Sequence, residues 1–217
     1  MFKYESDSRK VTNGQTFVAI KGLTVDGHDF IKNAIDNGAT EIICEHDIDF
    51  NIPYKIVDNT EEYLKEILNK EYGEEINKLT IIGVTGTNGK TTSCYLAYQM
   101  LLSLGIDTAY IGTLGYYHKD DFIELNNTTP DILTVFKLIM RAKEAGCTHI
   151  VMEVSSQALS YDRLNGIKFD IDVANPSSVT PTIQYQAGSF FVGVNGAYVG
   201  YSGSASKALD YNTQIYQ

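Results

Sequence analysis

Short apolar runs separated by polar turns fill the first part of the chain. The runs at 17–20, 41–44 and 54–57 have the length of buried strands and contain β-branched or aromatic residues. Polar and glycine-containing turns lie before and between them, as expected where one strand ends and the next element begins. This part of the sequence therefore predicts three strands.

Two amphipathic stretches accompany these strands. Residues 30–35 place apolar side chains on one face of a short helix that ends at Gly38, and residues 61–72 show the same helical spacing over a longer stretch. Together with the strands they predict a small α/β domain over residues 1–77. Residues 73–78 are polar enough to serve as the linker to the next domain.

After the linker the pattern becomes strand, loop, helix, strand. An apolar run at 79–84 ends in a glycine-punctuated loop, and a helix-forming segment follows at 92–102. Further apolar runs at 108–113 and 149–154 predict more buried strands. This order predicts a parallel sheet with right-handed crossovers, in a second domain over residues 78–175.

A hairpin and a helix are expected between the last two runs. Residues 116–125 predict a hairpin that turns at 119–121, and a helix with one apolar side is expected to stop at Gly146. In the loop before this helix, Thr129 can cap the helix and Pro130 can occupy its first position.

The composition changes near residue 175. Lys207 and Asp210 are the only charged residues from Ala174 onward, and the tail is rich in Gly, Ser, Tyr, Asn and Gln. This composition predicts short β-like pieces or an unstructured extension over 176–217, not continued β-α alternation.

Composition and charge narrow the class of protein. The 217 residues include 43% hydrophobic and 20% charged residues, as in soluble globular proteins. The net charge of −10 argues against a nucleic-acid-binding protein. No apolar stretch is long enough for a membrane span, and the first residues lack the apolar core of a signal peptide.

Cysteine and histidine positions bear on the compartment and on metal binding. Cys44, Cys94 and Cys147 lie far apart in apolar segments, which predicts buried, reduced thiols in a cytoplasmic protein. Neither these cysteines nor the four histidines show the spacing of metal-binding motifs, so the sequence does not predict a metal site built from them.

The glycine-punctuated loop has phosphate-binding chemistry. A strand, a glycine loop, Lys-Thr and a helix together direct backbone N–H groups toward a phosphate chain. Gly86 and Gly89 allow the bend, Lys90 can reach the outer phosphates of ATP or GTP, and the Thr91 hydroxyl can hold Mg²⁺. The common spacing would place glycine where Val84 stands. The alternative is a glycine-rich turn with an exposed lysine.

Other polar residues follow predicted elements. Glu153 ends a strand of the same sheet, so it can reach a metal near Thr91; the alternative is a surface carboxylate that caps a helix starting near Ser155. Residues 127–129 offer amide and hydroxyl donors, or simply cap a helix. Arg163 can bind a carboxylate or phosphate with two hydrogen bonds, or can be a solvated surface arginine.

Taken together, four segments resemble the Mur ligase family. They are Asp7-Ser8-Arg9 through Asp26-Gly27-His28, the loop Gly83–Thr92, Asn127-Thr128-Thr129-Pro130, and Met152–Leu159 with Arg163. The resemblance covers about residues 4–173. It implies a small amino-terminal α/β domain that binds a UDP-linked substrate, followed by a truncated P-loop ATPase domain with a parallel sheet.

The resemblance also implies a reaction. The enzyme would be an ATP-dependent amide ligase that adds the third amino acid to UDP-N-acetylmuramoyl-dipeptide in peptidoglycan synthesis, with Mg²⁺ as cofactor. The dipeptide carboxylate would attack the γ-phosphate of ATP to form an acyl phosphate, and the amino group of the third amino acid would displace phosphate. The protein would be a monomer.

Roles for individual residues follow from the matched motifs. Lys90 and Glu153 would be catalytic, with Thr91 and Glu153 as magnesium ligands. ATP would be bound by Gly86, Thr87, Asn88, Gly89, Lys90, Thr91 and Thr92. The UDP-linked substrate would be bound by Ser8, Leu23, Thr24, Val25, Asn127, Thr128, Thr129, Ser155 and Arg163.

Some positions depart from the family pattern. Gln157 stands where histidine is common, and Tyr161 where a glutamine often stands. After Asn175 the family's Asp-His-Leu-Asp segment, its active-site lysine and its carboxyl-terminal domain do not follow, so we expect a truncated chain with impaired ligase activity. The alternative is a non-catalytic fragment that binds the UDP-linked substrate. A P-loop kinase or GTPase is disfavoured because no guanine-reading motif or lid arginine cluster is recognisable.

Overall fold

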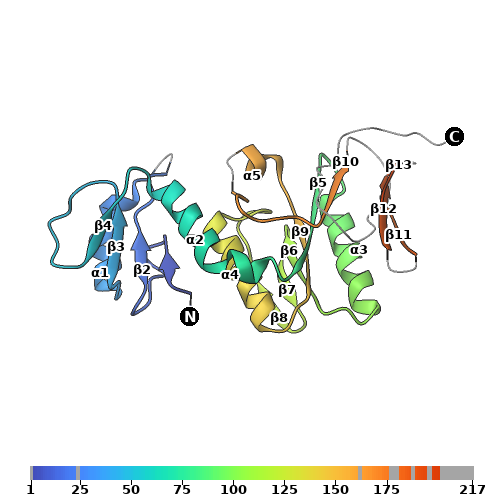
Figure 1. The fold of residues 1–217 in the computed structure, drawn as a ribbon, viewed down its shortest axis with the longest axis horizontal. Coiled ribbons are helices and arrows are strands. Elements are labelled where there is room, and N and C mark those ends of the chain that lie inside the picture. The colour runs from blue at the N-terminus through green and yellow to red at the C-terminus, as the bar shows by residue number, and fades with distance from the viewer. Residues whose placement is uncertain are drawn as a thin grey trace. The chain divides into compact units, whose positions relative to one another are not determined.

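The computed structural model describes residues 2–22, 25–160, 163–175, 181–186, 189–194 and 197–200. Most of its helices and strands are labelled in Figure 1. The first compact unit comprises residues 1–74 and 132–137, and the second comprises 75–131 and 138–217. The α/β class predicted from the sequence is confirmed. The predicted domain boundaries at 77/78 and 175/176 stay predictions.

A parallel four-stranded sheet organises the first unit. The strands, in their order across the sheet, are β1 (Tyr4–Glu5), β2 (Thr16–Val18), β3 (Glu41–Cys44) and β4 (Tyr54–Ile56). The three expected strands are all present, whereas β1 was not predicted because two residues carry no periodic pattern. A core packs against this sheet, formed by Val11, Phe17, Ala19, Ile31, Ala34, Ala39, Ile42 and Cys44.

The helices of the first unit include both predicted ones. They are the 3₁₀-helix η1 (Gly27–Phe30), α1 (Ile31–Asp36) and α2 (Thr60–Ile76). Gly38 follows α1 with a φ of +102°, a conformation that favours glycine and ends the helix.

The predicted linker at 73–78 is wrong over its first four residues, because α2 continues to Ile76. Leu64, Leu68 and Ile76 are all buried, and their separations of four and eight residues keep them on one face of the helix. A single glycine weakens a helix but does not end it. Burial of Ile76 is therefore the physical reason that the helix extends through a polar stretch.

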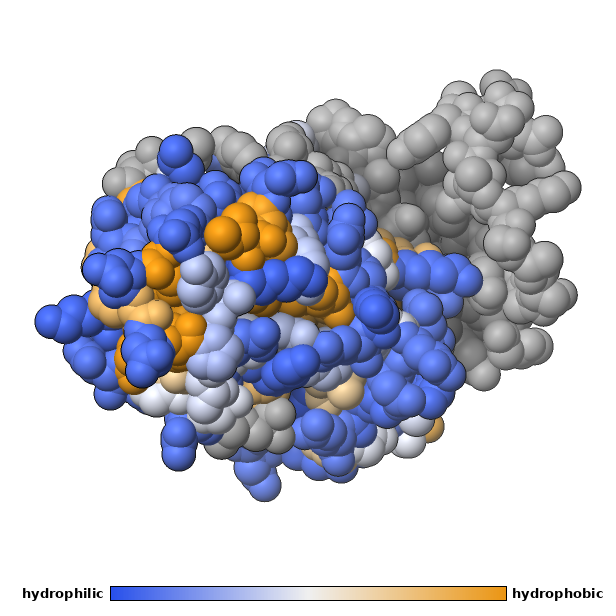
Figure 2. Space-filling model, turned by 60° about the vertical axis from the view of Figure 1, so that its left-hand side comes forward, coloured by the Kyte–Doolittle hydropathy of each residue, from blue (hydrophilic) through white to orange (hydrophobic). Residues whose placement is uncertain are grey.

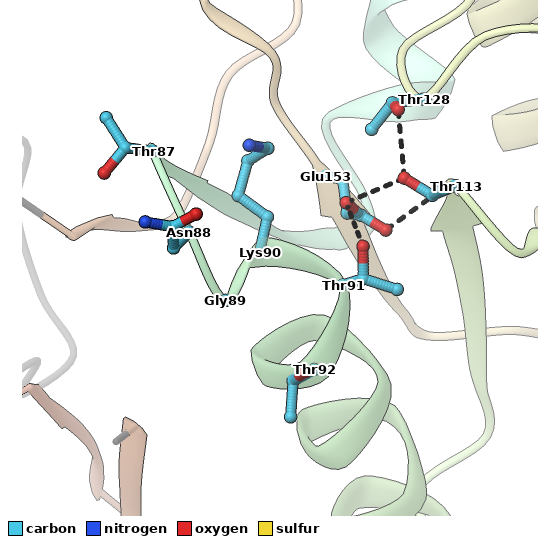
Figure 3. Close-up of a pocket in the computed structure, with 9 residues that line it drawn as sticks. All are labelled: Thr87, Asn88, Gly89, Lys90, Thr91, Thr92, Thr113, Thr128 and Glu153. Carbon is cyan, nitrogen blue, oxygen red and sulfur yellow. Dashed lines mark hydrogen bonds between the residues drawn. The ribbon is translucent and has the colours of Figure 1, made fainter. Parts of the chain in front are cut away.

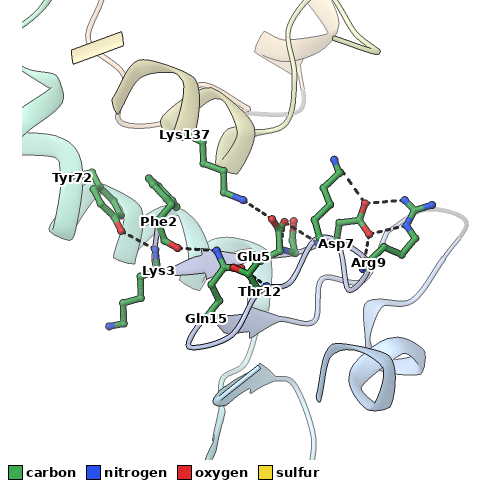
Figure 4. Close-up of polar contacts among 11 residues, drawn as sticks. Phe2, Lys3, Glu5, Asp7, Arg9, Thr12, Gln15, Tyr72 and Lys137 are labelled. Carbon is green, nitrogen blue, oxygen red and sulfur yellow. Dashed lines mark hydrogen bonds and ion pairs between the residues drawn. The ribbon is translucent and has the colours of Figure 1, made fainter. Parts of the chain in front are cut away.

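Side-chain hydrogen bonds fix the amino-terminal segment within the first unit (Figure 4). Gln15 Nε2 donates to the carbonyl of Phe2 over 2.8 Å. The Glu5 carboxylate forms an ion pair of 2.6 Å with Lys137, in the first half of α4 (Ile132–Glu144). The Glu5 side chain is 8% exposed, so this pair is screened less by solvent than a surface pair.

A six-stranded sheet organises the second unit. In their order across the sheet its strands are β10 (Ile171–Asn175), β5 (Thr80–Gly86), β9 (His149–Glu153), β6 (Thr108–Gly112), β7 (Gly115–His118) and β8 (Asp121–Ile123). The first four are parallel, as predicted, and β7 and β8 add an antiparallel hairpin. The hairpin turns at Lys119, whose φ is +54°, which confirms the predicted turn.

Helix α3 (Lys90–Ser103) packs against this sheet beside strands β5, β6 and β9. Their shared core contains Ile82, Val84, Cys94, Ala97, Tyr98, Leu101, Tyr110 and Val151. The helix ends before Gly105, whose φ of +77° fits the predicted stop. Cys44, Cys94 and Cys147 are free and buried, which confirms the predicted burial of the thiols.

Strand β10 was not predicted. The Asp170 N–H donates to the Ile81 carbonyl over 2.8 Å, and the Ile81 N–H donates to Asp170 Oδ2 over 2.9 Å. A Cβ at Gly83 would overlap the ring of Phe169. The absence of a side chain at Gly83 therefore lets the segment leading into β10 approach β5 closely.

In the tail, three antiparallel strands form a separate sheet: β11 (Pro181–Gln186), β12 (Ser189–Val194) and β13 (Ala197–Gly200). They agree with the predicted β-like pieces. The remaining positions of the predicted tail, 176–180, 187–188, 195–196 and 201–217, lie outside the described residues.

Hydrophilic residues cover much of the face shown in Figure 2, with apolar residues in patches between them. Exposed apolar residues of the first unit include Phe50, Tyr54 and Ile56, two of them on the edge strand β4. Among the described residues, no helix is long and apolar enough to cross a membrane.

Candidate functional site

The loop between β5 and α3 forms one wall of a pocket (Figure 3). Gly86 and Gly89 have φ values of +144° and +78°, so both adopt backbone conformations that residues with a side chain rarely take. Gly89 directly precedes α3, whose first residue is Lys90. The amino end of a helix favours anions because its first N–H groups are unpaired within the helix.

The pocket has a volume of about 330 Å³. It is lined by Thr87, Asn88, Gly89, Lys90, Thr91, Thr92, Thr113, Thr128 and Glu153. The Lys90 ammonium group donates to the carbonyl of Gly86 over 2.8 Å, so the side chain folds back along the loop. The pocket thus combines a cation, a helix amino terminus and several hydroxyl groups, which suits a phosphate chain.

A buried carboxylate lies opposite the lysine. Glu153 is 0% exposed and ends β9, whose register pairs it with Val84 of β5. Its Oε2 accepts from the Thr91 hydroxyl over 2.9 Å and from the Thr113 hydroxyl over 3.2 Å. Its Oε1 accepts from the Tyr110 hydroxyl over 2.5 Å and from the Thr113 N–H over 2.9 Å.

These four donors are neutral groups. They satisfy the hydrogen-bonding capacity of the Glu153 carboxylate but do not neutralise its negative charge. Burial, reinforced by the hydrogen bond to Glu153, raises the pKa of Tyr110 far above its usual value, which keeps the phenol protonated as a donor. Burial and the nearby Glu153 also raise the pKa of Cys94, so its thiol stays neutral. A cation at the pocket would meet a carboxylate held in one orientation.

Gly112 makes room for this arrangement. A Cβ at this position would overlap both the Glu153 carboxylate and the Tyr110 hydroxyl. Gly112 is the last residue of β6, so its missing side chain leaves space at the carboxyl end of the strand. This requirement does not follow from the sequence, because Glu153 is distant from Gly112 and Tyr110 is hidden within the same strand pattern.

Two threonines connect the loop before α4 to Thr113 and to the main chain of Glu153. The Thr128 and Thr113 hydroxyl oxygens lie 2.9 Å apart, and this brings Thr128 into the pocket. Thr129 is 1% exposed; its hydroxyl donates to the Glu153 carbonyl and accepts from the Ser155 N–H, both over 2.9 Å. Residue 129 thereby fixes the loop against the end of β9.

The predicted helix cap at Thr129 is therefore wrong. Its hydroxyl donates to the carbonyl of Glu153 at the end of β9. Helix α4 begins at Ile132, so Pro130 is not the first helical residue. The alternative role for Glu153 as a helix cap is also wrong. Ser155 has that position, because its Oγ accepts from the Ala158 N–H over 3.1 Å at the start of α5 (Ser156–Ser160).

The other predicted substrate residues of the second unit lie outside the pocket lining. Asn127 is exposed, and Ser155 and Arg163 are partly buried. Arg163 Nη1 donates to the Thr129 carbonyl over 3.4 Å. This hydrogen bond connects Arg163 to the loop that contains Thr128 and Thr129, and the role of Arg163 in substrate binding stays a prediction.

Ser8 and Val25 belong to the first unit. Ser8 is buried, and its carbonyl accepts from Asn37 Nδ2 over 2.8 Å. Val25 is exposed, and its carbonyl accepts from the Gly22 N–H over 2.9 Å. Leu23 and Thr24 lie outside the described residues, so the predicted contacts of this loop with substrate stay predictions.

Sequence reasoning missed two residues that hold Glu153. Tyr110 lies within β6 and Thr113 directly follows it. A signal was present, because the predicted strand at 108–113 ends at the same edge of the parallel sheet as Glu153. The sequence did not show that β6 and β9 are neighbours in the sheet.

Comparison with protein families identifies both parts of the chain. Residues 4–76 match the model described as "Mur ligase family, catalytic domain". Residues 84–181 match the model described as "Mur ligase middle domain". The second match begins in β5 and includes every residue that lines the pocket.

Similar curated proteins carry one name, UDP-N-acetylmuramoyl-L-alanyl-D-glutamate–2,6-diaminopimelate ligase. The protein from Bacillus cereus is 43% identical over 169 residues, which cover 78% of this chain and 34% of the relative. The protein from Parabacteroides distasonis is 39% identical over 169 residues, covering 76% and 35%. The chain thus spans about a third of the length of these relatives.

Solved structures show the same fold. A structure of a ligase with that name matches with a TM-score of 0.62 and 29% identity, covering 83% of this chain and 37% of the other. MurF from Acinetobacter baumannii matches with a TM-score of 0.55 and 18% identity, covering 91% and 54%, and this likeness supports the fold alone.

Proposed function

Because this chain belongs to the Mur ligase family, we propose that it binds MgATP and a UDP-linked muramoyl peptide for an ATP-dependent amide ligation. The proposed reaction adds the third amino acid to UDP-N-acetylmuramoyl-dipeptide in peptidoglycan synthesis. The names of its relatives support this reaction class. The cytoplasmic location and the monomeric state expected from the sequence stay predictions.

One observation carries the nucleotide part of the proposal. The buried Glu153 carboxylate meets the Thr91 hydroxyl 2.9 Å away, beside a glycine loop and Lys90. The helix terminus and the lysine would bind the phosphate oxygens of ATP, since both supply donors to negative charge.

The residues present fit Mg²⁺. Magnesium prefers oxygen ligands from carboxylates and hydroxyl groups and keeps several waters, and Glu153 and Thr91 supply two such oxygens on one wall of an open pocket. These two residues would hold the ion. Bound there, it would neutralise charge that builds up on the phosphates during transfer.

The chain's own residues have simpler tasks in this proposal. Lys90 orients the outer phosphates and balances their charge, while Tyr110 and Thr113 hold Glu153 in place. Thr128, with Arg163, would face the muramoyl-peptide portion, and the buried Thr129 would hold their loop against the end of β9. The carboxylate of that peptide would attack the terminal phosphate of ATP and displace ADP. The amine of the incoming amino acid would then displace phosphate from the acyl phosphate, lose a proton and form the amide bond.

Binding of ATP to the Lys90→Ala variant tests the nucleotide part. We expect affinity for MgATP, measured by calorimetry, to fall about 10- to 100-fold because a charge-assisted contact to phosphate is lost. Lys168→Ala removes an exposed lysine of the same unit and should bind as the unaltered chain does. Equal affinity in Lys90→Ala and the unaltered chain would contradict the proposal.

The substrate part requires its own titration. UDP-N-acetylmuramoyl-dipeptide should bind the unaltered chain and the Lys90→Ala variant equally, because its UDP part is assigned to the first unit. UDP alone should compete with it. Failure of both the UDP-linked peptide and UDP to bind would contradict this assignment and leave the nucleotide result unaffected.

A further inference from the structure

Three potential metal ligands lie together where the parallel strands of the second sheet begin. This end of the sheet is opposite the phosphate loop. Asp107 precedes β6, Cys147 lies shortly before β9, and His118 ends the antiparallel strand β7. All three therefore lie at the amino ends of the parallel strands, whereas the pocket with Glu153 lies at their carboxyl ends. The two places are separate sites on one sheet.

The ligand atoms lie close together. One atom from each of Asp107, His118 and Cys147 lies within 4.8 Å of the other two. His118 Nε2 is 2.8 Å from Asp107 Oδ1, and Cys147 Sγ is 4.0 Å from the same oxygen. His118 and Cys147 are each 4% exposed, while the Asp107 side chain is 30% exposed and so provides access from solvent.

The chemistry of the donors selects the kind of cation. A thiolate sulfur, an imidazole nitrogen and a carboxylate oxygen are the three ligand types that Zn²⁺ accepts in proteins, at distances of about 2.0–2.3 Å. Mg²⁺ and Ca²⁺ prefer oxygen ligands alone. The set therefore fits a borderline-soft divalent cation and disfavours the ion proposed at Glu153.

Backbone contacts hold Asp107 and Cys147 before any cation binds, and His118 lies in β7, which is paired with β8. The Asp107 carbonyl accepts from the N–H groups of Thr148 and His149 over 3.0 and 3.3 Å. The Cys147 N–H donates to the Ala142 carbonyl over 3.0 Å, at the end of α4. The site thus requires little rearrangement of the chain, which lowers the entropy loss on binding.

Lys119 orients the carboxylate. Its ammonium group lies 2.7 Å from Asp107 Oδ2, the oxygen that does not face His118. Second partners of this kind commonly fix the orientation of a ligating carboxylate. Lys119 can keep Oδ2 while Oδ1 turns toward a cation shared with the imidazole and the thiolate.

We propose that Asp107, His118 and Cys147 bind one borderline-soft divalent cation of the Zn²⁺ type, with water as a fourth ligand. On binding, the thiol proton passes to solvent, and the imidazole presents the Nε2 lone pair with its proton on Nδ1. The cation would join the amino ends of β6 and β9 to the β7–β8 hairpin. This role is independent of ATP and of the proposed ligation.

Cobalt and zinc titrations of the full chain test the proposal. Co²⁺ is the spectroscopic probe, because a cobalt–thiolate bond gives a charge-transfer absorption that oxygen and nitrogen ligands do not. We expect this absorption to saturate at one Co²⁺ per chain and to vanish when Zn²⁺ is added. Excess Mg²⁺ should leave it unchanged.

Variants assign the signal to its residues. Cys147→Ser should abolish the charge-transfer absorption, and His118→Gln should weaken Zn²⁺ binding at least about tenfold. Cys44→Ser is the matched control, since it removes another buried thiol, in the first unit, and should leave cobalt binding intact.

Several outcomes would overturn the site. One is the absence of a thiolate absorption in the unaltered chain, a result that does not depend on the folding of any variant. Another is an absorption that persists in Cys147→Ser, and a third is its loss in Cys44→Ser. In each case the three residues form only a hydrogen-bonded ion-pair cluster, or the cation binds elsewhere.

Discussion

At the scale of single residues, Glu153 collects hydrogen bonds from parts of the chain far away in the sequence. Thr91 is 62 residues distant, Tyr110 is 43 and Thr113 is 40. A buried carboxylate without partners would be costly, so these donors explain how Glu153 can remain buried beside an open pocket. They also make Tyr110 a positioning residue for a proposed magnesium ligand.

Replacement of Tyr110 by phenylalanine tests this positioning. The ring is kept and one hydrogen bond to a charged group is lost, which lowers stability by about 1.5–3 kcal/mol. We also expect Mg²⁺ to strengthen ATP binding less than in the unaltered chain, because the carboxylate is less constrained. Urea unfolding and calorimetry with and without Mg²⁺ measure the two effects.

Tyr116→Phe is a matched control for this variant. The Tyr116 hydroxyl is buried and has no hydrogen-bond partner among the described residues, so its removal should leave stability unchanged or raise it. Equal destabilisation by the two substitutions, or an unchanged Mg²⁺ effect in Tyr110→Phe, would contradict the assigned role.

The glycine at position 112 makes a second prediction at this scale. Gly112→Ala places a Cβ against the carboxylate of Glu153 and the hydroxyl of Tyr110, and overpacking of this kind lowers stability by about 1–3 kcal/mol. The Mg²⁺ dependence of ATP binding should fall with it. A variant with full stability and full Mg²⁺ dependence would show that the carboxylate does not need this space.

At the scale of elements, three neighbouring parallel strands position the residues that line the pocket. β5 leads into the glycine loop proposed to bind phosphate, β9 ends at Glu153, and β6 is followed by Thr113. Sequence analysis predicted all three strands and placed Glu153 at the correct sheet edge. It did not predict β10, because the pairing of that segment with β5 depends on a close approach at Gly83.

The length of α2 can be tested with Gly73→Ala. Gly73 lies inside the helix, and the nearest atom to an added Cβ is 3.9 Å away, so alanine fits without strain. Alanine should stabilise the protein by about 0.5–1 kcal/mol by favouring the helical backbone. Thermal and urea unfolding measure this change, and a destabilised Gly73→Ala variant would indicate that residue 73 belongs to a linker.

At the scale of the whole molecule, the central sheet of the second unit carries two different kinds of chemistry at its two edges. The carboxyl edge offers hydroxyl groups, a lysine and a carboxylate, as a phosphate chain with Mg²⁺ requires. The amino edge offers sulfur, nitrogen and oxygen donors from Cys147, His118 and Asp107. Ligands selective for one edge should therefore bind without competing with those of the other.

The sequence by itself determined the glycine loop between β5 and α3 and the order of most strands and helices along the chain. Gly86, Gly89, Lys90 and Thr91 are near neighbours in the chain, so the geometry that they need is set by local backbone preferences. The apolar runs and the stops at glycine likewise depend on short-range patterns.

Only the tertiary structure decided which distant side chains meet. The order of strands in the sheet brings Tyr110 and Thr113 to Glu153 and places Asp107, His118 and Cys147 together. The Thr129 hydroxyl bonds to the main chain at the end of β9. These residues have no characteristic spacing in the sequence. Their proximity follows from sheet pairing and burial, which no local pattern specifies.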